Sequence, residues 1–115
     1  MIVGPGGSVQ VKKSFSCTSR HAIYAIICLK CGELYIGETG RMLAERFREH
    51  LGDIRNARTH REVAAHFNLP GHSLEDVSVS GVMSHPVTQR RRLLESELIR
   101  KLGTLYPQGM NREED

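Results

Sequence analysis

The stretch AIYAIICLKCGELYIGETGRMLAERFREH, residues 22–50, holds the clearest structural pattern in this 115-residue chain. Its first six residues, 22–27, are all apolar or aromatic, and successive side chains of an extended strand point to opposite faces. Ile23 and Ile27 therefore share one face, while Tyr24 lies on the other. The alternation predicts a half-buried strand in which Tyr24 is turned away from the row that contains Ile23.

A turn, a second strand and a helix are predicted to follow. Residues 28–32, Cys-x-x-Cys-Gly, favour a tight turn, and residues 34–37 then favour a second strand, so that the two strands form a hairpin. A helix should begin after Gly40 and end near Ala57. Its apolar stripe recurs at three- and four-residue spacing: Leu43, Phe47, Leu51 and Ile54.

Three further elements are predicted in the second half of the chain. Residues 62–68 read as a short helix that Pro70-Gly71 stops. The valines in residues 77–82 predict a third strand. A last helix should begin near Ser84, whose side chain can cap it, and end at Gly103.

Polar residues occupy sheltered positions on both long helices. At about 100° per residue, Arg46 and His50 project together beside the apolar stripe of the first helix. On the last helix Glu95 lies within the apolar arc, whereas Glu97 lies outside it. An unpaired buried carboxylate is costly, so Glu95 is less easily explained as ordinary surface than Glu97.

The length and composition of the chain limit the number of domains, the size of the core and the kind of partner that we expect. The length suits one compact domain, and an apolar fraction of 39% with 5% aromatics predicts a small core. Residues 1–8, rich in glycine, read as a flexible leader or cloning remnant, which leaves 9–115 as a single domain. No apolar run approaches the roughly 20 residues of a membrane span, and we expect an intracellular protein with no membrane partner. The formal net charge of +3 suits a polyanionic partner without requiring one.

Three motifs in fixed order carry a resemblance to a known family. They are Ala22-Ile23-Tyr24, Tyr35-Ile36-Gly37-x-Thr39 and Leu43-x-x-Arg46-x-x-x-His50. Together they resemble the signature of the GIY-YIG nucleases, with Ala22 in place of the first glycine. The Cys-x-x-Cys between the two tyrosine strands and the GETGR after Tyr35 most resemble the endonuclease domain of Penelope-like retroelements. The resemblance implies an α+β fold, a small three-stranded antiparallel sheet flanked by helices.

The resemblance also implies a set of catalytic residues: Tyr24, Tyr35, Arg46, His50, Glu95 and Asn111. Glu95 would bind a catalytic Mg²⁺ or Mn²⁺, both of which prefer hard oxygen ligands. Arg46 would neutralise phosphate charge. The tyrosines would position or deprotonate the attacking water, His50 would help to move the proton, and Asn111 would close the site. Taken singly, each has a simpler interpretation as a packed tyrosine, a solvated helix edge or half of a structural ion pair.

Cys28, Cys31, His66 and His72 form a second candidate site. Two thiolates and two imidazoles make a closed tetrahedral Zn²⁺ site, and a two-residue gap lets both sulfurs reach one ion. The Penelope-like endonucleases are similar in having two cysteines and two later histidines at these places, which implies a structural Zn²⁺. The alternative is a free thiol pair in a turn and two loop histidines, with His21, His60 and His85 as spare ligands. Cys17 is expected to be an ordinary half-buried thiol.

The resemblance implies one function above the others. The chain would be the divalent-metal-dependent endonuclease domain of a Penelope-like retrotransposon, a monomer that nicks double-stranded DNA and leaves a 3′-hydroxyl to prime reverse transcription. Its partner would be a reverse transcriptase domain in the same polyprotein, and it would act in the nucleus of a eukaryotic host. A free-standing repair or restriction nuclease of this family is a second interpretation. A third is a catalytically silent, zinc-stabilised DNA-binding module, which the substitution at Ala22 makes plausible.

Overall fold

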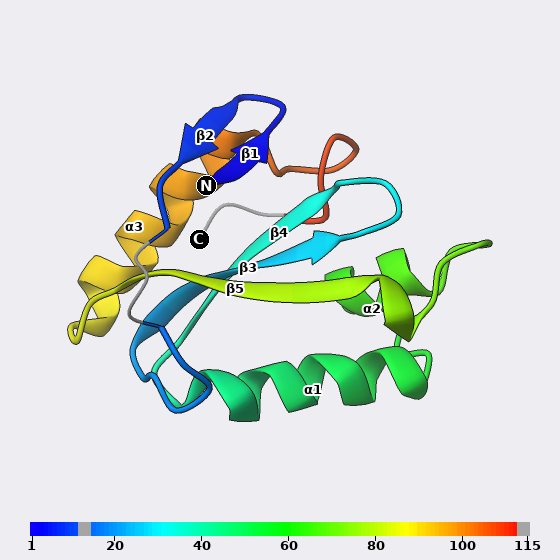
Figure 1. Ribbon diagram of the computed structural model, residues 1–115, viewed down its shortest axis with the longest axis horizontal. Helices are drawn as coiled ribbons and strands as arrows, with labels where there is room; N and C mark the ends of the chain where they lie inside the picture. The colour runs from blue at the N-terminus through cyan, green and yellow to red at the C-terminus, as the bar shows by residue number, and fades with distance from the viewer. Residues whose placement is uncertain (12–14, 113–115) are drawn as a thin grey trace.

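The central element of the fold is strand β3 (Ala22–Cys28), which pairs with a strand on each side (Figure 1). β4 (Leu34–Thr39) and β5 (Val77–Ser84) both run antiparallel to it, in the order β4-β3-β5. The computed structural model describes residues 1–11 and 15–112. The predicted α+β fold with a three-stranded antiparallel sheet is confirmed.

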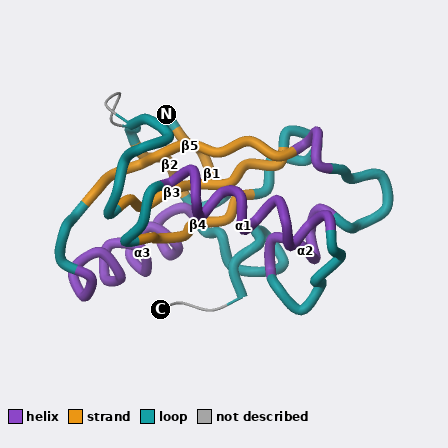
Figure 2. The backbone as a smooth tube through the Cα atoms, turned by 90° about the horizontal axis from the view of Figure 1, so that it is seen from below, coloured by secondary structure: helices purple, strands orange, loops and turns teal. Residues whose placement is uncertain are grey.

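Helices cover both faces of this sheet. α1 (Leu43–Arg55) and α2 (Glu62–Phe67) pack on the face that carries Tyr24, and α3 (Thr88–Leu102) packs on the face that carries Ile23. Figure 2 looks from the side of α1, with the sheet behind it. The alternation predicted for β3 is confirmed, but the strand is buried on both faces rather than half-buried, because it is the middle strand between two helical layers.

The first residues form a hairpin, where the sequence had suggested a flexible leader over residues 1–8. β1 (Ile2–Gly4) and β2 (Gly7–Val9) pair with each other and lie against α3. The Gly6 amide donates to the Leu102 carbonyl over 3.0 Å, and Ile2 is buried in the same core as α3. The apolar side chains at each end of the hairpin supply the burial that orders it.

The last helix begins later than predicted. Ser84 does not cap it but ends β5, where it pairs with Ala22, and the His85 amide extends this pairing by donating to the His21 carbonyl. α3 starts at Thr88, and its N-cap residue makes no side-chain capping bond. The backbone pairing of β5 therefore prevails over the capping signal at Ser84.

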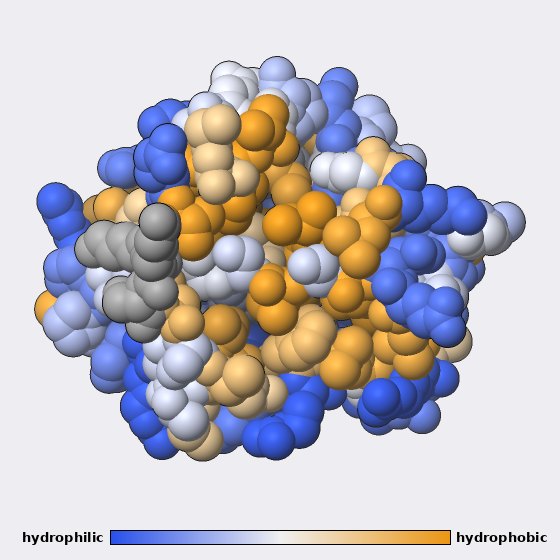
Figure 3. Space-filling view, in the orientation of Figure 1, coloured by the Kyte–Doolittle hydropathy of each residue, from blue (hydrophilic) through white to orange (hydrophobic). Residues whose placement is uncertain are grey.

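A separate apolar surface lies over β5 and α1 (Figure 3). A hollow of about 530 Å³ there is lined by residues of the segment before β3, of α1 and of β5, among them Phe15, Phe47 and Val79.

Within the described residues, no helix is long and apolar enough to cross a lipid bilayer.

Candidate active site

The two tyrosines meet over a glycine. Tyr24 on β3 lies opposite Gly37 on β4, and Tyr35 precedes Gly37 by two residues on the same strand. The tyrosine ring centroids are 6.4 Å apart. A Cβ atom placed on Gly37 would lie 2.5 Å from the Tyr24 hydroxyl and 2.9 Å from the Tyr35 ring. Glycine is therefore required at this position for both rings to pack against the strand.

His50 of α1 completes an aromatic triad with these tyrosines. Its Nε2 atom lies 2.7 Å from the Tyr24 hydroxyl, and its ring centroid is 5.5 Å from that of Tyr35. His50 is buried, and this burial, together with the charge of Arg46, lowers its pKa to about 4. The imidazole is therefore neutral near pH 7, and its Nε2 can accept the proton of the Tyr24 hydroxyl.

Burial also holds both tyrosines in their protonated form. It raises the pKa of Tyr24 far above its usual range, with a smaller contribution from the neighbouring Tyr35. Burial and the charge of Glu62 raise the pKa of Tyr35 to about 12. Neither phenol is ionised near neutral pH, so the pair can donate and accept hydrogen bonds but holds no negative charge.

Arg46 lies one turn before His50, within electrostatic reach of both tyrosines. Burial opposes its charge, but the tyrosines and a hydrogen bond to Glu49 raise the pKa of Arg46 overall. The Glu49 carboxylate accepts from Arg46 over 2.9 Å and from Arg41 over 2.8 Å. The hydrogen bond from Arg41 is the largest effect lowering the pKa of Glu49, to about 2. Glu49 thus holds the guanidinium of Arg46 beside the tyrosines.

Glu95 enters the site from α3, on the other side of the sheet from α1. It is buried, and its charge makes a small contribution to the raised pKa of both Tyr24 and Tyr35, so the carboxylate lies within electrostatic reach of the phenols. Arg91, one turn earlier on α3, donates through Nε to Glu38 of β4 over 2.7 Å. This partly buried ion pair fastens α3 to β4. It was not predicted from the sequence, although the spacing of Arg91 and Glu95 places them on one helix face.

Asn111 is bound to the backbone of β4. Its side-chain amide donates to the Ile36 carbonyl over 2.9 Å, and its Oδ1 accepts from the Ile36 amide over 2.8 Å. The Thr104 hydroxyl donates to the same Oδ1 over 2.7 Å. Asn111 thus fixes the stretch of β4 between Tyr35 and Gly37. This geometry suits a positioning role for Asn111. It fits that role better than direct contact with the reacting atoms.

The structure therefore brings four of the six predicted catalytic residues to one region: Tyr24, Tyr35, Arg46 and His50. Glu95 lies within electrostatic reach of the tyrosines, and Asn111 is bound at the free edge of β4. A hollow of about 290 Å³ opens between α1 and the loop that follows it, with Tyr35, Arg46 and His50 in its wall. Ala22, which stands in the place of the first signature glycine, is fully buried within β3 and pairs with Thr39 and Ser84. The fold accommodates its methyl group within paired strands, and a bulge against β5 follows between Ile23 and Tyr24.

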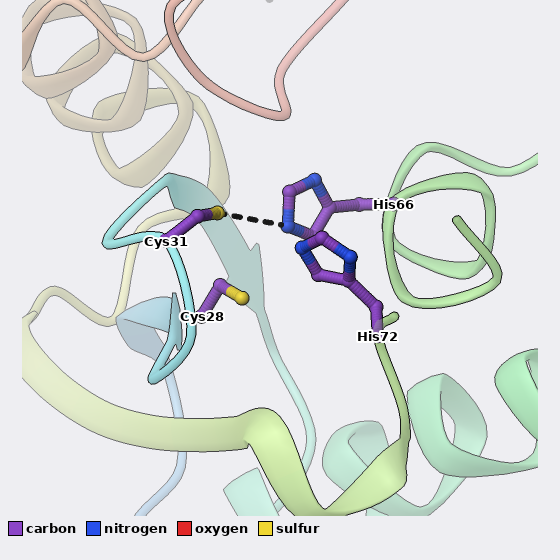
Figure 4. Close-up of side chains that lie close together, drawn as sticks. All are labelled: Cys28, Cys31, His66 and His72. Carbon is purple, nitrogen blue, oxygen red and sulfur yellow. Dashed lines mark hydrogen bonds between the residues drawn. The ribbon is translucent and has the colours of Figure 1, made fainter. Parts of the chain in front are cut away.

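The four predicted metal ligands also lie together (Figure 4). The ligand atoms of Cys28, Cys31, His66 and His72 are all within 4.8 Å of one another, and in the close-up they surround a common point. Cys31 Sγ lies 3.4 Å from His66 Nε2. None of the spare histidines belongs to this cluster. Cys17 is also apart from it, and is exposed rather than half-buried as expected.

Hydrogen bonding at this cluster suits a bound metal ion. His72 Nδ1 lies 3.3 Å from the Pro70 carbonyl, and its Nε2 is buried without a hydrogen-bond partner, facing the cysteines. Burial lowers the pKa of His66, which favours the neutral imidazole that a metal requires. Zn–S and Zn–N bonds of about 2.3 and 2.0 Å place tetrahedral ligands roughly 3.3–3.8 Å apart, close to the spacing present here. The cluster could hold one such ion.

The turn that carries the two cysteines is built for this arrangement. The Gly32 amide donates to the Cys28 carbonyl over 2.7 Å, and Gly32 adopts φ +81°, which favours glycine. The Leu29 amide donates to the Asp76 carbonyl over 2.8 Å, which joins the turn to the segment after His72. The hairpin and the α2 region therefore meet at the metal ligands.

Comparison with known proteins agrees with this geometry. The sequence matches the GIY-YIG catalytic domain family over residues 20–111. The fold is similar to that of a point mutant of the catalytic domain of the intron endonuclease I-TevI, with a TM-score of 0.71 at 17% identity over 84% of this chain and 97% of the other. A second structure, the catalytic domain of the homing endonuclease I-TevI, gives 0.67 at 18% identity over 80% and 97%. No curated protein matches the sequence.

The site and the fold together define a nuclease catalytic domain. The chain belongs to the GIY-YIG catalytic domain family, whose matched region contains both tyrosines, Arg46, His50, Glu95 and Asn111. It is accordingly a DNA endonuclease domain.

Proposed function

We propose that this GIY-YIG domain nicks double-stranded DNA with the help of a divalent cation and leaves a 3′-hydroxyl. The observation that carries the proposal is the buried Tyr24–His50 hydrogen bond of 2.7 Å beside the guanidinium of Arg46. A neutral imidazole joined to a phenol can take a proton from a water molecule bound at the phenol. Arg46 supplies the positive charge that phosphate oxygens need.

The proton has a defined path in this arrangement. Water attacks phosphorus, its proton passes to the Tyr24 oxygen, and the Tyr24 proton passes to His50 Nε2, so that no tyrosinate accumulates. Tyr35 lies close enough to orient the same water. The bond from phosphorus to the 3′-oxygen breaks as the new bond from water forms, and the departing 3′-oxygen takes up a proton from solvent water. The products are a 5′-phosphate and a 3′-hydroxyl.

Glu95 is the residue that would bind Mg²⁺ or Mn²⁺. A single buried carboxylate facing a substrate phosphate is a usual anchor for Mg²⁺, which keeps several waters and needs few protein ligands. When bound there, the cation would supply positive charge to the departing 3′-oxygen. Arg91 and Glu38 hold α3 against β4 and so position Glu95 for this role.

The cysteine–histidine cluster would hold a structural Zn²⁺. Four protein ligands leave no open coordination position, so this ion would not activate water. It would instead tie the β3–β4 hairpin to α2 and the loop after it. Because Tyr35 follows the hairpin turn, the same tie would help to keep Tyr35 in place.

A Penelope-like retroelement is the biological setting that we favour. The Cys-x-x-Cys insertion between the tyrosine strands and the GETGR segment after Tyr35 support it. In that setting the 3′-hydroxyl primes synthesis by a reverse transcriptase domain of the same polyprotein in the nucleus. One active site per chain suits a monomer that cuts one strand at a time.

Relaxation of supercoiled plasmid tests the proposed activity. At low protein concentration with Mg²⁺ or Mn²⁺, open circles should build up well before linear molecules appear. Chelation of the divalent cation should stop the reaction. Direct appearance of linear product, without transient open circles, would show a concerted dimer and contradict the nickase assignment. Absence of any cleavage would favour the DNA-binding module instead.

A further inference from the structure

The loop after α1 folds back beside the active site. Ala57 adopts φ +51°, a left-handed conformation that non-glycine residues rarely take, and it reverses the chain. The Arg58 amide then donates to the Asp53 carbonyl over 3.0 Å. The opposite end of the loop is held by the Arg112 side chain, which donates to the His60 carbonyl over 3.1 Å. The loop conformation is therefore defined from both sides.

Asp53 holds two arginines of this loop with one carboxylate. Arg58 Nη1 lies 3.3 Å from Oδ1, and Arg61 Nε lies 3.6 Å from Oδ2. The Asp53 side chain is 9% exposed, whereas those of Arg58 and Arg61 are 54% and 55% exposed. The carboxylate thus orients the guanidinium groups without covering them.

These arginines border the same space as the catalytic residues. Arg61 and Asp53 line the hollow that contains Tyr35, Arg46 and His50, and they also line an adjoining hollow of about 290 Å³ that contains Arg46 and Arg58. Asp53 is seven residues after Arg46 on α1, which is about 10 Å along the helix axis. This distance corresponds to about three nucleotide steps of one DNA strand.

We infer that Arg58 and Arg61, oriented by Asp53, form a second phosphate subsite for the substrate strand, within about three nucleotides of the scissile phosphate. The inference rests on the proposed function, because it deepens the description of the same site. The inference also separates arginines that belong to the subsite from other arginines of α1 that do not. Arg48 lines the apolar hollow of Figure 3, on another side of α1, and does not belong to the subsite.

Binding of a 30-base-pair duplex without divalent cation, measured across salt concentrations, tests the subsite. Arg61→Ala should lower the affinity about tenfold and reduce the slope of log K against log salt by about one. Arg48→Ala, a matched arginine control on α1, should change the affinity less than threefold. Equal losses in the two variants would show a diffuse basic surface and overturn the inference.

Asp53→Asn distinguishes most clearly between a subsite of oriented arginines and a diffuse basic surface. It raises the net charge by one, so a diffuse basic surface would bind DNA more tightly. A subsite that needs oriented arginines should bind more weakly, and circular dichroism and thermal unfolding would verify that the variant is folded. Tighter binding by folded Asp53→Asn would contradict the inference.

Single methylphosphonate linkages then locate the contact in substrates with a mapped cut. One neutral linkage within three nucleotides of the cut should slow nicking by the original protein about tenfold, and Arg61→Ala should be insensitive to it. The same sensitivity at every position in both proteins would refute the subsite. If the domain does not nick DNA, the proposed function fails, whereas the cation-free binding measurements still decide the subsite.

Discussion

The hydroxyl of Tyr24 and Nε2 of His50 are 2.7 Å apart in the buried space between β3 and α1. This hydrogen bond joins the central strand to the helix that carries Arg46. It also couples the protonation of a phenol to that of an imidazole with an unusually low pKa. The proposed proton path and the stability of the domain therefore depend on the same pair.

The stability of the domain should fall as the pH decreases from about 6.5 toward 4. The unfolded chain protonates His50 near its ordinary pKa of 6.5, whereas the folded protein does so only near 4, so protons favour the unfolded state within this window. Between pH 7 and pH 5 this residue should account for about 2 kcal/mol of lost unfolding free energy. Urea unfolding at both pH values measures the loss. His50→Gln should lose correspondingly less, and equal losses in both proteins would exclude His50 as the cause.

Tyr24→Phe should reduce nicking at least 100-fold. The change removes the group that passes the proton to His50 and leaves a buried nitrogen without its donor, so the unfolding free energy should also fall by about 1–3 kcal/mol. Tyr106→Phe is the matched control, because Tyr106 is 75% exposed. Single-turnover nicking and urea unfolding provide the two readouts. Full activity in folded Tyr24→Phe would eliminate the proton path.

Gly37→Ala and Gly52→Ala should have opposite effects on stability. A methyl group on Gly37 would collide with Tyr24 and Tyr35 and should cost about 1–3 kcal/mol while displacing the phenols. Gly52 lies inside α1 with no atom within 4 Å of an added Cβ, so alanine there should stabilise by about 0.5–1 kcal/mol. Thermal unfolding measures both. A Gly37→Ala protein as stable as the original would show that the tyrosines can move away without cost.

Loss of the metal cluster should lower stability and metal content together. Cys28→Ser and His72→Ala should each bind less than one Zn²⁺ per chain and lower Tm by more than about 10 °C, since metal binding contributes folding free energy. Cys17→Ser removes an exposed thiol outside the cluster and should change neither quantity. Elemental analysis and thermal scans decide the result. Unchanged Zn²⁺ content in both ligand variants would reject this ligand set.

Periodicity was sufficient to predict the individual strands of the sheet and the positions of α1 and α2, whereas the three-stranded antiparallel sheet was implied by the family resemblance. Period-two alternation assigned Tyr24 and Ile23 to opposite faces of β3, as the structure has them. It could not show that β3 is the middle strand, because strand order depends on contacts between distant segments. The ordered hairpin at residues 2–9 was missed for the same reason: its stability comes from α3, about 90 residues later in the chain.

Short-range sequence signals did not predict the structure where backbone pairing or ion pairs between distant residues determined it. Ser84 resembles a helix cap, but pairing with Ala22 keeps it in β5. The ion pair between Glu38 and Arg91 spans 53 residues and leaves no periodic trace in the sequence. The turn at Ala57 lacks the glycine that usually marks a positive φ, so the approach of the arginines to Asp53 was not visible either.

Single-turnover nicking by Glu95→Gln tests the central claim most directly. Glu95 is buried within electrostatic reach of the tyrosines, whereas Glu97, two residues later on α3, is exposed, so Glu97→Gln is a matched control with the same chemical change. At saturating Mg²⁺, Glu95→Gln should nick plasmid at least 1,000-fold more slowly while binding duplex DNA with nearly unchanged affinity, and Glu97→Gln should remain fully active. Near-normal nicking by Glu95→Gln would contradict the assignment of the catalytic cation to this carboxylate.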